Sequence, residues 1–158
     1  MDNVHSAFLT KTIDLANEAI KQGGGPFAAI VVDRKGNIIG QGTNSVTNTN
    51  DPTAHAEVVA IRNACDQKGH FQIDGCTLYT SCEPCPMCLG AIYWARPDAV
   101  YFAATQKDAA AVGFDDAFIY EEIGKEYGTR QIPFYGVEAV NRLEPFQTWE
   151  TYTKKTEY

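Results

Sequence analysis

Two short stretches of the sequence carry residues of the types that bind zinc. The first is T-A-H-A-E at residues 53–57, and the second is S-C-E-P-C-P-M-C at residues 81–88. Cys85 and Cys88 are three residues apart, and in the first turn of a helix this spacing places both sulfur atoms on one face. Two thiolates and the imidazole of His55 would form a Cys2His set, which leaves one tetrahedral position for water. The spacing therefore predicts a catalytic zinc site.

Glu57 follows the histidine by two residues, a spacing that does not place both side chains on one face in the middle of a helix. At the N-terminus of a helix, side chains of the first turn can converge on a metal near the axis. Glu57 would then reach the metal-bound water rather than the metal. A carboxylate that moves a proton of this water suits the hydrolysis of a C–NH2 bond on an aromatic ring. We therefore expect Glu57 to be the catalytic acid–base group.

A closed structural zinc site is an alternative from the same residues. Cys82, Cys85 and Cys88 follow one another at two successive C-x-x-C spacings and could form a Cys3His site with His55. Such a site has no position for water and leaves Glu57 without a role. The fourth zinc ligand therefore separates an enzyme from a zinc-stabilised binding module.

The composition favours a small neutral ligand over a nucleic acid. The chain has 158 residues, a length that fits one domain, and a formal net charge of −7. A protein that binds phosphate groups is expected to be basic or to carry a basic stripe, and the lysines and arginines here do not cluster. We expect no nucleic-acid partner.

The cysteines indicate metal binding rather than disulfide formation. There are five, an odd number, and three of them fall within residues 82–88. This pattern fits a metal site in a reducing compartment better than a secreted disulfide framework, whereas Cys65 and Cys76 are expected in the core. The N-terminal residues contain no apolar run. We therefore expect a cytoplasmic protein without a signal peptide or membrane partner.

The hydrophobic pattern predicts strands that alternate with helices, and thus a sheet layered between helices. Both ligand groups fall where helices are expected to begin, so that the partial positive charge of each N-terminus would stabilise thiolates. The backbone N–H group of Ala56 would lack a partner within its helix and could bind a substrate oxygen. We expect helices over residues 6–22, 55–68 and 86–94, and strands over residues 28–33, 37–43, 75–81, 99–103 and 133–140.

Several further motifs surround the two zinc-binding stretches. They are G-G-P-F at 24–27, Asn44, N-D-P-T-A-H-A-E at 50–57, G-A-I-Y-W-A-R at 90–96, G-F-D-D at 113–116 and K-K-T-E-Y at 154–158. H-x-E followed by P-C-x-x-C is the signature of zinc deaminases. With these motifs the chain resembles the cytidine deaminase superfamily and, within it, the small bacterial guanine deaminases. The narrower likeness depends on Trp94, the Asp115-Asp116 pair and Tyr158.

The resemblance implies a fold and an activity. The fold is a three-layer α/β/α sandwich of cytidine-deaminase type, a single domain over residues 1–158, with a mixed five-stranded sheet and helices on both faces. The activity is zinc-dependent hydrolysis of guanine to xanthine and ammonia in purine catabolism, with one Zn2+ per subunit. Transfer-RNA adenosine deaminase and cytosine deaminase are the alternatives within the superfamily.

The resemblance also implies substrate contacts for residues that could equally have structural roles. Phe27 and Trp94 would supply apolar walls, although both could pack in the core. Asn44 and Asp116 would bind the purine edge, although Asn44 could stabilise its own turn and the paired aspartates could be a solvated cap.

The C-terminal segment is expected to cover an active site. Residues 145–158 contain four aromatic side chains, and exclusion of water strengthens electrostatic contacts in a site. We therefore expect a lid over residues 145–158 that places Tyr158 near the substrate. The resemblance to guanine deaminases, which are dimers, implies a homodimer whose C-terminal segments could be exchanged by domain swapping. The alternative is a last helix on the chain's own sheet.

Overall fold

The structure is a computed structural model that describes residues 3–158. The chain forms two compact units, of which the first ends at Ala117 and the second is Phe118–Tyr158. No helix in the described part of the chain is both long and apolar enough to cross a membrane. The first unit contains α1 (Asn3–Lys21), β1 (Ala28–Asp33), β2 (Ile38–Thr43), α2 (Val46–Thr49), α3 (Ala56–Lys68), β3 (Cys76–Cys82), α4 (Pro86–Ala95), β4 (Ala99–Ala104) and α5 (Gln106–Ala110).

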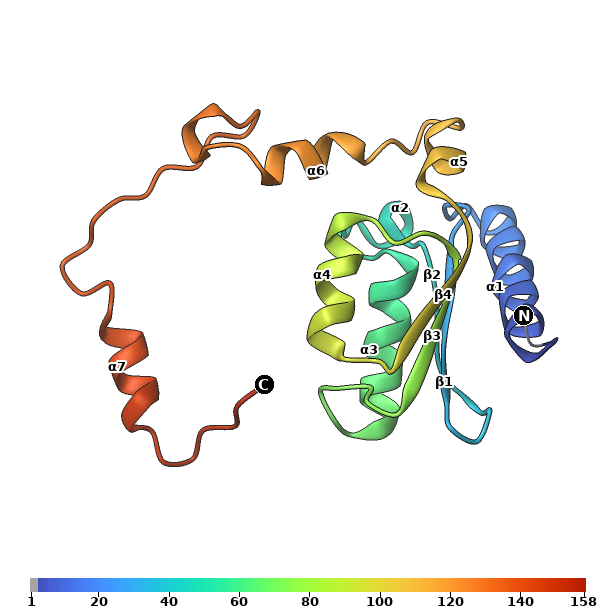
Figure 1. Cartoon of the computed structure of the whole chain (residues 1–158), viewed down its shortest axis with the longest axis horizontal. Helices are drawn as coiled ribbons and strands as arrows, with labels where there is room; N and C mark the ends of the chain where they lie inside the picture. Colours follow the sequence, from blue (N-terminus) through green and yellow to red (C-terminus); the bar gives the residue numbers. More distant parts are fainter. Residues whose placement is uncertain (1–2) are drawn as a thin grey trace. The chain divides into compact units, whose positions relative to one another are not determined.

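The four strands form one mixed sheet in the order β2-β1-β3-β4. β1 pairs antiparallel with β2 and β3, whereas β3 pairs parallel with β4. The predicted hairpin of the first two strands is therefore confirmed. Helix α1 lies on one face of the sheet, and α3 and α4 lie on the other (Figure 1). The predicted mixed sheet with helices on both faces is present in the first unit.

The prediction of a fifth strand is wrong for the part of the chain that the structure describes, where the sheet has four strands. Residues 133–140 form no strand, and the large side chains of Phe134, Tyr135, Val137 and Val140 are exposed. A strand requires a neighbouring strand for its N–H and C=O groups, and an apolar sequence alone does not supply one. The apolar run at 133–140 was therefore an insufficient signal for a strand.

The core consists of two clusters, one on each face of the sheet. Successive side chains of a strand point to opposite faces, so that Ile30 packs with α1 while Ala29 and Val31 pack with α3. Leu78 and Tyr79 of β3 divide between the two faces in the same way. Because both faces are covered, β1 is buried over almost its whole length.

Two glycines of β2 allow helix α3 to approach the sheet closely. A Cβ atom at Gly42 would overlap the carbonyl oxygen of Ala56, and one at Gly40 would overlap that of Ala60. Any side chain at these positions would displace the helix. The glycines thereby set the depth at which the first turn of α3 lies against the sheet.

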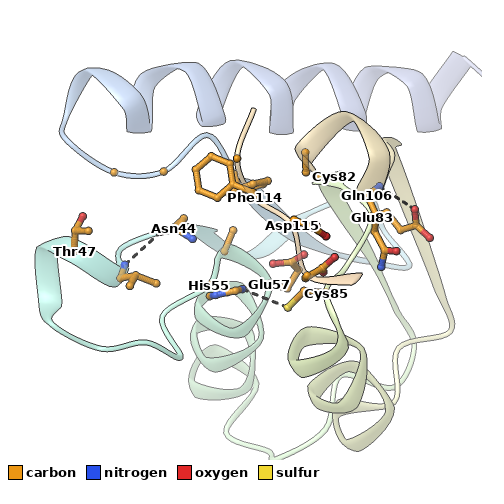
Figure 2. Close-up of a pocket in the computed structure, with 18 of the residues that line it drawn as sticks. Asn44, Thr47, His55, Glu57, Cys82, Glu83, Cys85, Gln106, Phe114 and Asp115 are labelled. Carbon is orange, nitrogen blue, oxygen red and sulfur yellow. Dashed lines mark hydrogen bonds between the residues drawn. The ribbon is translucent and has the colours of Figure 1, made fainter. Parts of the chain in front are cut away.

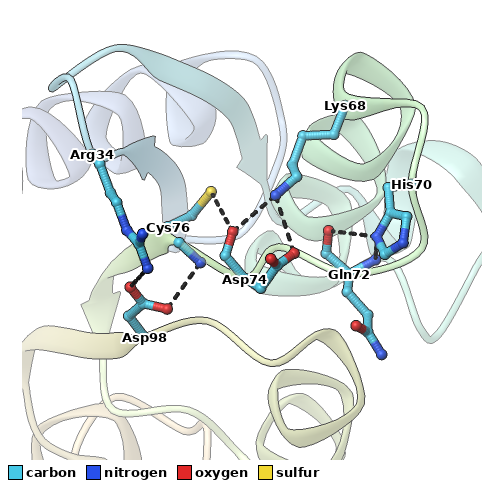
Figure 3. Close-up of polar contacts among 8 residues, drawn as sticks. Arg34, Lys68, His70, Gln72, Asp74, Cys76 and Asp98 are labelled. Carbon is cyan, nitrogen blue, oxygen red and sulfur yellow. Dashed lines mark hydrogen bonds and ion pairs between the residues drawn. The ribbon is translucent and has the colours of Figure 1, made fainter.

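A group of polar contacts joins the loops at the end of β3 that is remote from Cys82 (Figure 3). The Asp98 carboxylate accepts hydrogen bonds from the backbone N–H of Gly75, at 2.8 Å, and from Nη2 of Arg34, at 3.1 Å. Both hydrogen bonds, that of Gly75 first, lower the pKa of Asp98. Lys68 Nζ donates to the carbonyl oxygen of Asp74 at 2.8 Å. These contacts connect the end of α3 to the starts of β3 and β4.

The second unit has no buried residue. It contains most of α6 (Ala117–Ile123), the 3-10 helix η1 (Tyr127–Thr129) and α7 (Glu144–Thr151), and all of Phe118–Tyr158 is exposed or intermediate. The guanidinium group of Arg130 lies 4.9 Å from the ring centroid of Tyr127 and donates to the carbonyl oxygen of Ile123. This unit therefore lacks a hydrophobic core of its own.

Candidate active site

The structure brings His55, Cys85 and Cys88 together at the starts of two helices. Their ligand atoms all lie within 4.8 Å of one another. The Nδ1 atom of His55 is 3.5 Å from Sγ of Cys85 and 3.6 Å from Sγ of Cys88. His55 is the N-cap of α3 and Cys85 the N-cap of α4, whose first position, Pro86, needs no backbone N–H. Two helix N-termini therefore point their partial positive charge at one point.

This donor set has the chemistry of a zinc site. A hydrogen bond from Cys88, and then one from His55, lower the pKa of Cys85 to about 4, so that its sulfur is a thiolate at neutral pH. The same hydrogen bond and burial raise the pKa of the Cys88 thiol, and a coordinating metal would deprotonate it. Two sulfurs and one imidazole nitrogen match the preference of zinc and form an open set of three.

The carboxylate of Glu57 lies beside these three residues and is only 6 % exposed. Its Oε1 atom accepts a hydrogen bond from the hydroxyl of Thr80 at 3.3 Å, and Oε2 is 3.4 Å from Sγ of Cys88. Burial raises the pKa of Glu57. A raised carboxyl pKa suits a group that must both accept and donate a proton near neutral pH.

Cys82, the fourth ligand of the alternative closed site, is directed elsewhere. Its Sγ atom donates to the carbonyl oxygen of Thr105 at 3.5 Å, and it is not part of the group formed by His55, Cys85 and Cys88. Burial, and then the charge of Glu57, raise the pKa of the Cys82 thiol to about 11. In this geometry Cys82 is a buried thiol with its own acceptor, which favours an open zinc site.

A cavity of about 520 Å³ opens above the donor set (Figure 2). Four of the residues expected to contact substrate line it, namely Phe27, Asn44, Ala56 and Asp116, together with His55, Glu57 and Cys85. Phe27 meets Phe114 edge to face, with ring centroids 5.0 Å apart. Burial, and then the charge of Cys85, raise the pKa of Asp116. The cavity thus combines an aromatic wall, an amide and a carboxyl group above the donor set.

The comparisons with known proteins agree with this site. Residues 2–104 match the cytidine and deoxycytidylate deaminase zinc-binding region, which spans more than half of the chain and contains all three ligand candidates and Glu57. The chain belongs to this deaminase family. It is 57 % identical to guanine deaminase of Bacillus subtilis (strain 168) over 155 residues, which cover 98 % of this chain and 99 % of that protein. The likeness to the crystal structure of guanine deaminase from Bacillus subtilis has a TM-score of 0.95 at 56 % identity, covering 100 % of this chain and 99 % of that one.

A tRNA-specific adenosine deaminase matches a smaller share of the chain. The chain is 39 % identical to a tRNA-specific adenosine deaminase of Haemophilus influenzae over 109 residues, which cover 66 % of this chain and 63 % of that protein. The likeness to this adenosine deaminase therefore covers about two thirds of the chain. The likeness to the guanine deaminase relative continues into the C-terminal third.

Trp94, which is expected to contact substrate, is not among the residues of the first unit that line the cavity. Trp94 lies in the last turn of α4 and is 62 % exposed. It follows Cys88 by six residues, which is about 9 Å along a helix, and this rise carries the indole away from the ligands. The role of Trp94 as an apolar wall of a substrate site therefore stays a prediction. Tyr158 lies in the second unit and is 70 % exposed.

Some of the residues that line the cavity were not found by sequence reasoning. Glu83 accepts a hydrogen bond from the backbone N–H of Gln106 at 3.1 Å, so that the start of α5 is tied to the cysteine motif. Phe114 precedes the aspartate pair, and its place opposite Phe27 depends on how the chain returns after β4. Glu83 could have been suspected because it lies directly before the P-C-x-x-C motif, whereas Gln106 carries no local signal.

Proposed function

We propose that this deaminase-family chain hydrolyses guanine to xanthine and ammonia in a zinc-dependent reaction, as part of purine catabolism. The observation that carries the chemistry is the convergence of His55, Cys85, Cys88 and the buried Glu57 beneath one cavity. The choice of guanine is supported by the likeness to guanine deaminase, which extends over almost the whole chain, whereas the likeness to the adenosine deaminase covers two thirds of it.

His55, Cys85 and Cys88 would hold the zinc ion, and Glu57 would move the protons. Zinc, when bound, supplies a water molecule of lowered pKa as the nucleophile. Glu57 accepts a proton from this water as the C2–O bond forms and delivers it to a ring nitrogen. The same carboxylate would then take up the proton of the new C2 hydroxyl as C2=O forms, and pass it to the amine as the C2–N bond breaks, which releases ammonia. One buried carboxylate can serve both transfers because it passes on each proton that it accepts and is thereby regenerated.

The cavity offers groups that suit a purine base. The Asn44 amide can donate and accept hydrogen bonds at once, and Asp116 adds a carboxyl group at the same cavity. The Phe27 ring, braced by Phe114, supplies an apolar wall. The backbone N–H of Ala56 lies at the start of α3, where such groups lack partners within the helix. We assign the purine edge to Asn44 and Asp116.

The second unit supports a homodimer with exchanged C-terminal segments. None of the residues 118–158 is buried, and large apolar side chains such as Phe134, Leu143, Phe146 and Trp149 are exposed. Exposed apolar surface of this extent is typical of an interaction site rather than of the surface of a monomer. In our proposal residues 1–158 act as one catalytic domain. Its lid, residues 145–158, places Tyr158 at the active site of the partner.

A cytoplasmic location completes the proposal. The five cysteines of the chain form no disulfide, and zinc thiolates persist in a reducing compartment. The purine base and water are the expected small-molecule partners. With a formal net charge of −7, the chain is not expected to bind transfer RNA.

Ammonia release from a panel of substrates tests the activity. The zinc-loaded protein is incubated with guanine, adenine, cytosine, cytidine and a transfer RNA, and we expect turnover of guanine to exceed the others by several orders of magnitude. A buried polar group left without its partner costs about 1 to 3 kcal/mol, so that two such groups discriminate strongly. Comparable turnover of cytosine, or of adenosine in transfer RNA, would overturn the assignment.

A further inference from the structure

A residue of the central sheet donates a hydrogen bond to the carboxylate of Glu57. Thr80 lies in β3, and its hydroxyl donates to Oε1 of Glu57 at 3.3 Å. The side chain of Thr80 is fully buried, at 1 % exposed, and Glu57 is nearly so. The contact joins two elements, the first turn of α3 and the middle of the sheet, that are 23 residues apart in sequence.

The polar side chain of Thr80 stands in an otherwise apolar row. Alternate residues of β3 point to the same face, and Cys76 and Leu78 of this row belong to the cluster beneath α3 and α4. Valine has nearly the same shape as threonine and a similar preference for strands, so that packing alone does not call for a hydroxyl here. A buried hydroxyl is costly unless it has a partner, and its partner here is Glu57.

The two oxygens of the carboxylate have different surroundings. Oε1 accepts from Thr80, whereas Oε2 lies 3.4 Å from Sγ of Cys88, on the side of the zinc-ligand candidates. A Cys88 thiolate has no proton to donate, so that among the described residues Thr80 remains the side-chain donor to Glu57. One fixed oxygen prevents the carboxylate from rotating and keeps the other directed at the reacting atoms.

We propose that Thr80 is a positioning residue, which holds Oε1 of Glu57 so that Oε2 carries the proton between water and the purine. This inference rests on the proposed function, since it assigns a task within that reaction. Thr80 is not among the residues that line the cavity, and its hydroxyl is hydrogen-bonded to Glu57. Its effect on the reaction passes through the orientation of Glu57.

The test compares Thr80→Val, which removes the hydroxyl at constant shape, with the wild-type protein. We expect kcat for guanine to fall by about tenfold to a hundredfold, the range for a hydrogen bond to a charged group, while KM and zinc content stay unchanged. Thr80→Ser and Thr80→Ala provide a second comparison at smaller volume. Ser should restore most of kcat, and Ala should not.

Two controls separate positioning from a general effect on folding. Thr12 is another fully buried threonine, in α1, whose hydroxyl donates to the carbonyl oxygen of Leu9 at 2.7 Å. Thr12→Val should leave kcat unchanged, even if it lowers the melting temperature. In a Glu57→Gln background, Thr80→Val should not change the dissociation constant of guanine, which is measured without turnover.

Three outcomes would overturn the proposal. They are wild-type kcat in Thr80→Val, equal losses in Thr80→Ser and Thr80→Ala, and a loss confined to KM. If Glu57→Gln abolishes turnover while Thr80→Val does not, the assignment of Thr80 fails and the proposed function stands. Absence of guanine turnover in the zinc-loaded wild-type protein would instead remove the proposed function itself.

Discussion

Gly25 lies directly against the side-chain amide of Asn44. A Cβ atom at position 25 would be 3.0 Å from Cγ and 3.1 Å from Oδ1 of this asparagine, closer than nine in ten Cβ contacts in proteins. The Oδ1 atom of Asn44 also accepts a weak hydrogen bond from the backbone N–H of Val46, at 3.4 Å. The glycine and the loop before α2 thus enclose the amide that faces the cavity.

We predict that Gly25→Ala raises KM for guanine by about five- to tenfold and changes kcat less. The added methyl group displaces the Asn44 amide, and loss of one neutral hydrogen bond corresponds to a change of this size. Steady-state kinetics with guanine provide the measurement. Gly90→Ala is the matched control, because a Cβ atom at Gly90 meets no atom within 4 Å. A wild-type KM in Gly25→Ala would show that Asn44 does not bind the substrate in its observed position.

Glu57→Gln is expected to retain zinc and to bind guanine, but to lose turnover by about 10² to 10⁴-fold or more. Glutamine keeps the shape of the side chain but cannot take up the proton, and general acid–base groups contribute this range. Metal analysis, guanine binding and kcat are measured on the same preparation. Wild-type turnover in this variant would end the proposed mechanism.

Replacement of each of the three motif cysteines by alanine is expected to affect zinc content differently. Cys82→Ala should keep its zinc and most of its activity, because the Cys82 sulfur is directed at the carbonyl oxygen of Thr105. Cys85→Ala and Cys88→Ala should lose the metal, since each removes one of three candidate ligands. Zinc content per chain provides the readout. Equal loss of metal in all three variants would indicate the closed Cys3His site.

The hydrogen bonds of Asp98 are expected to make a pH-dependent contribution to the stability of the folded protein. Its pKa in the folded protein lies below the value of 3.8 for the free side chain, because Gly75 N–H and Arg34 bind its charged form. The contribution is therefore present above the unfolded-state pKa and is lost as the pH falls through the folded-state pKa. Asp98→Asn should lower the melting temperature at neutral pH, and the difference from wild type should vanish in acid. A difference that does not change with pH would contradict this assignment.

Removal of residues 154–158 is expected to leave the fold and zinc content intact and to reduce guanine turnover markedly. The deleted residues are in the second unit, which has no buried residue, so that the core of the first unit is not affected. Circular dichroism, zinc content and kcat are compared with those of the full-length chain. Unaltered kinetics would show that these residues are not part of a lid.

Exchange of the C-terminal segments between subunits makes a separate prediction. A mixture of the Glu57→Gln chain and the truncated chain should regain part of the lost activity. In a mixed dimer the truncated chain supplies an intact Glu57, and its partner supplies an intact C-terminal segment. No recovery, with mixed dimers shown to form, would indicate that each segment covers the site of its own chain.

Elements with local signals could be predicted from the sequence. The C-x-x-C spacing and the proline before each of Cys85 and Met87 predict two sulfurs at a helix start, and α4 begins at Pro86 as expected. The β-rich runs on either side of a polar turn predicted β1 and β2 at nearly their observed bounds. These features depend on spacing within a few residues, which the sequence displays directly.

Contacts between residues that are distant in the chain required the tertiary structure. Thr80 is 23 residues from Glu57 in sequence, and its hydroxyl reaches the carboxylate because β3 lies beneath the first turn of α3. The position of Phe114 opposite Phe27 likewise depends on the return of the chain after β4. The apolar run at 133–140 did not become a strand, since pairing requires a neighbour that no local pattern supplies. Side-chain type and spacing indicate which secondary structure a segment prefers. The contacts that the segment makes depend on how the whole chain packs.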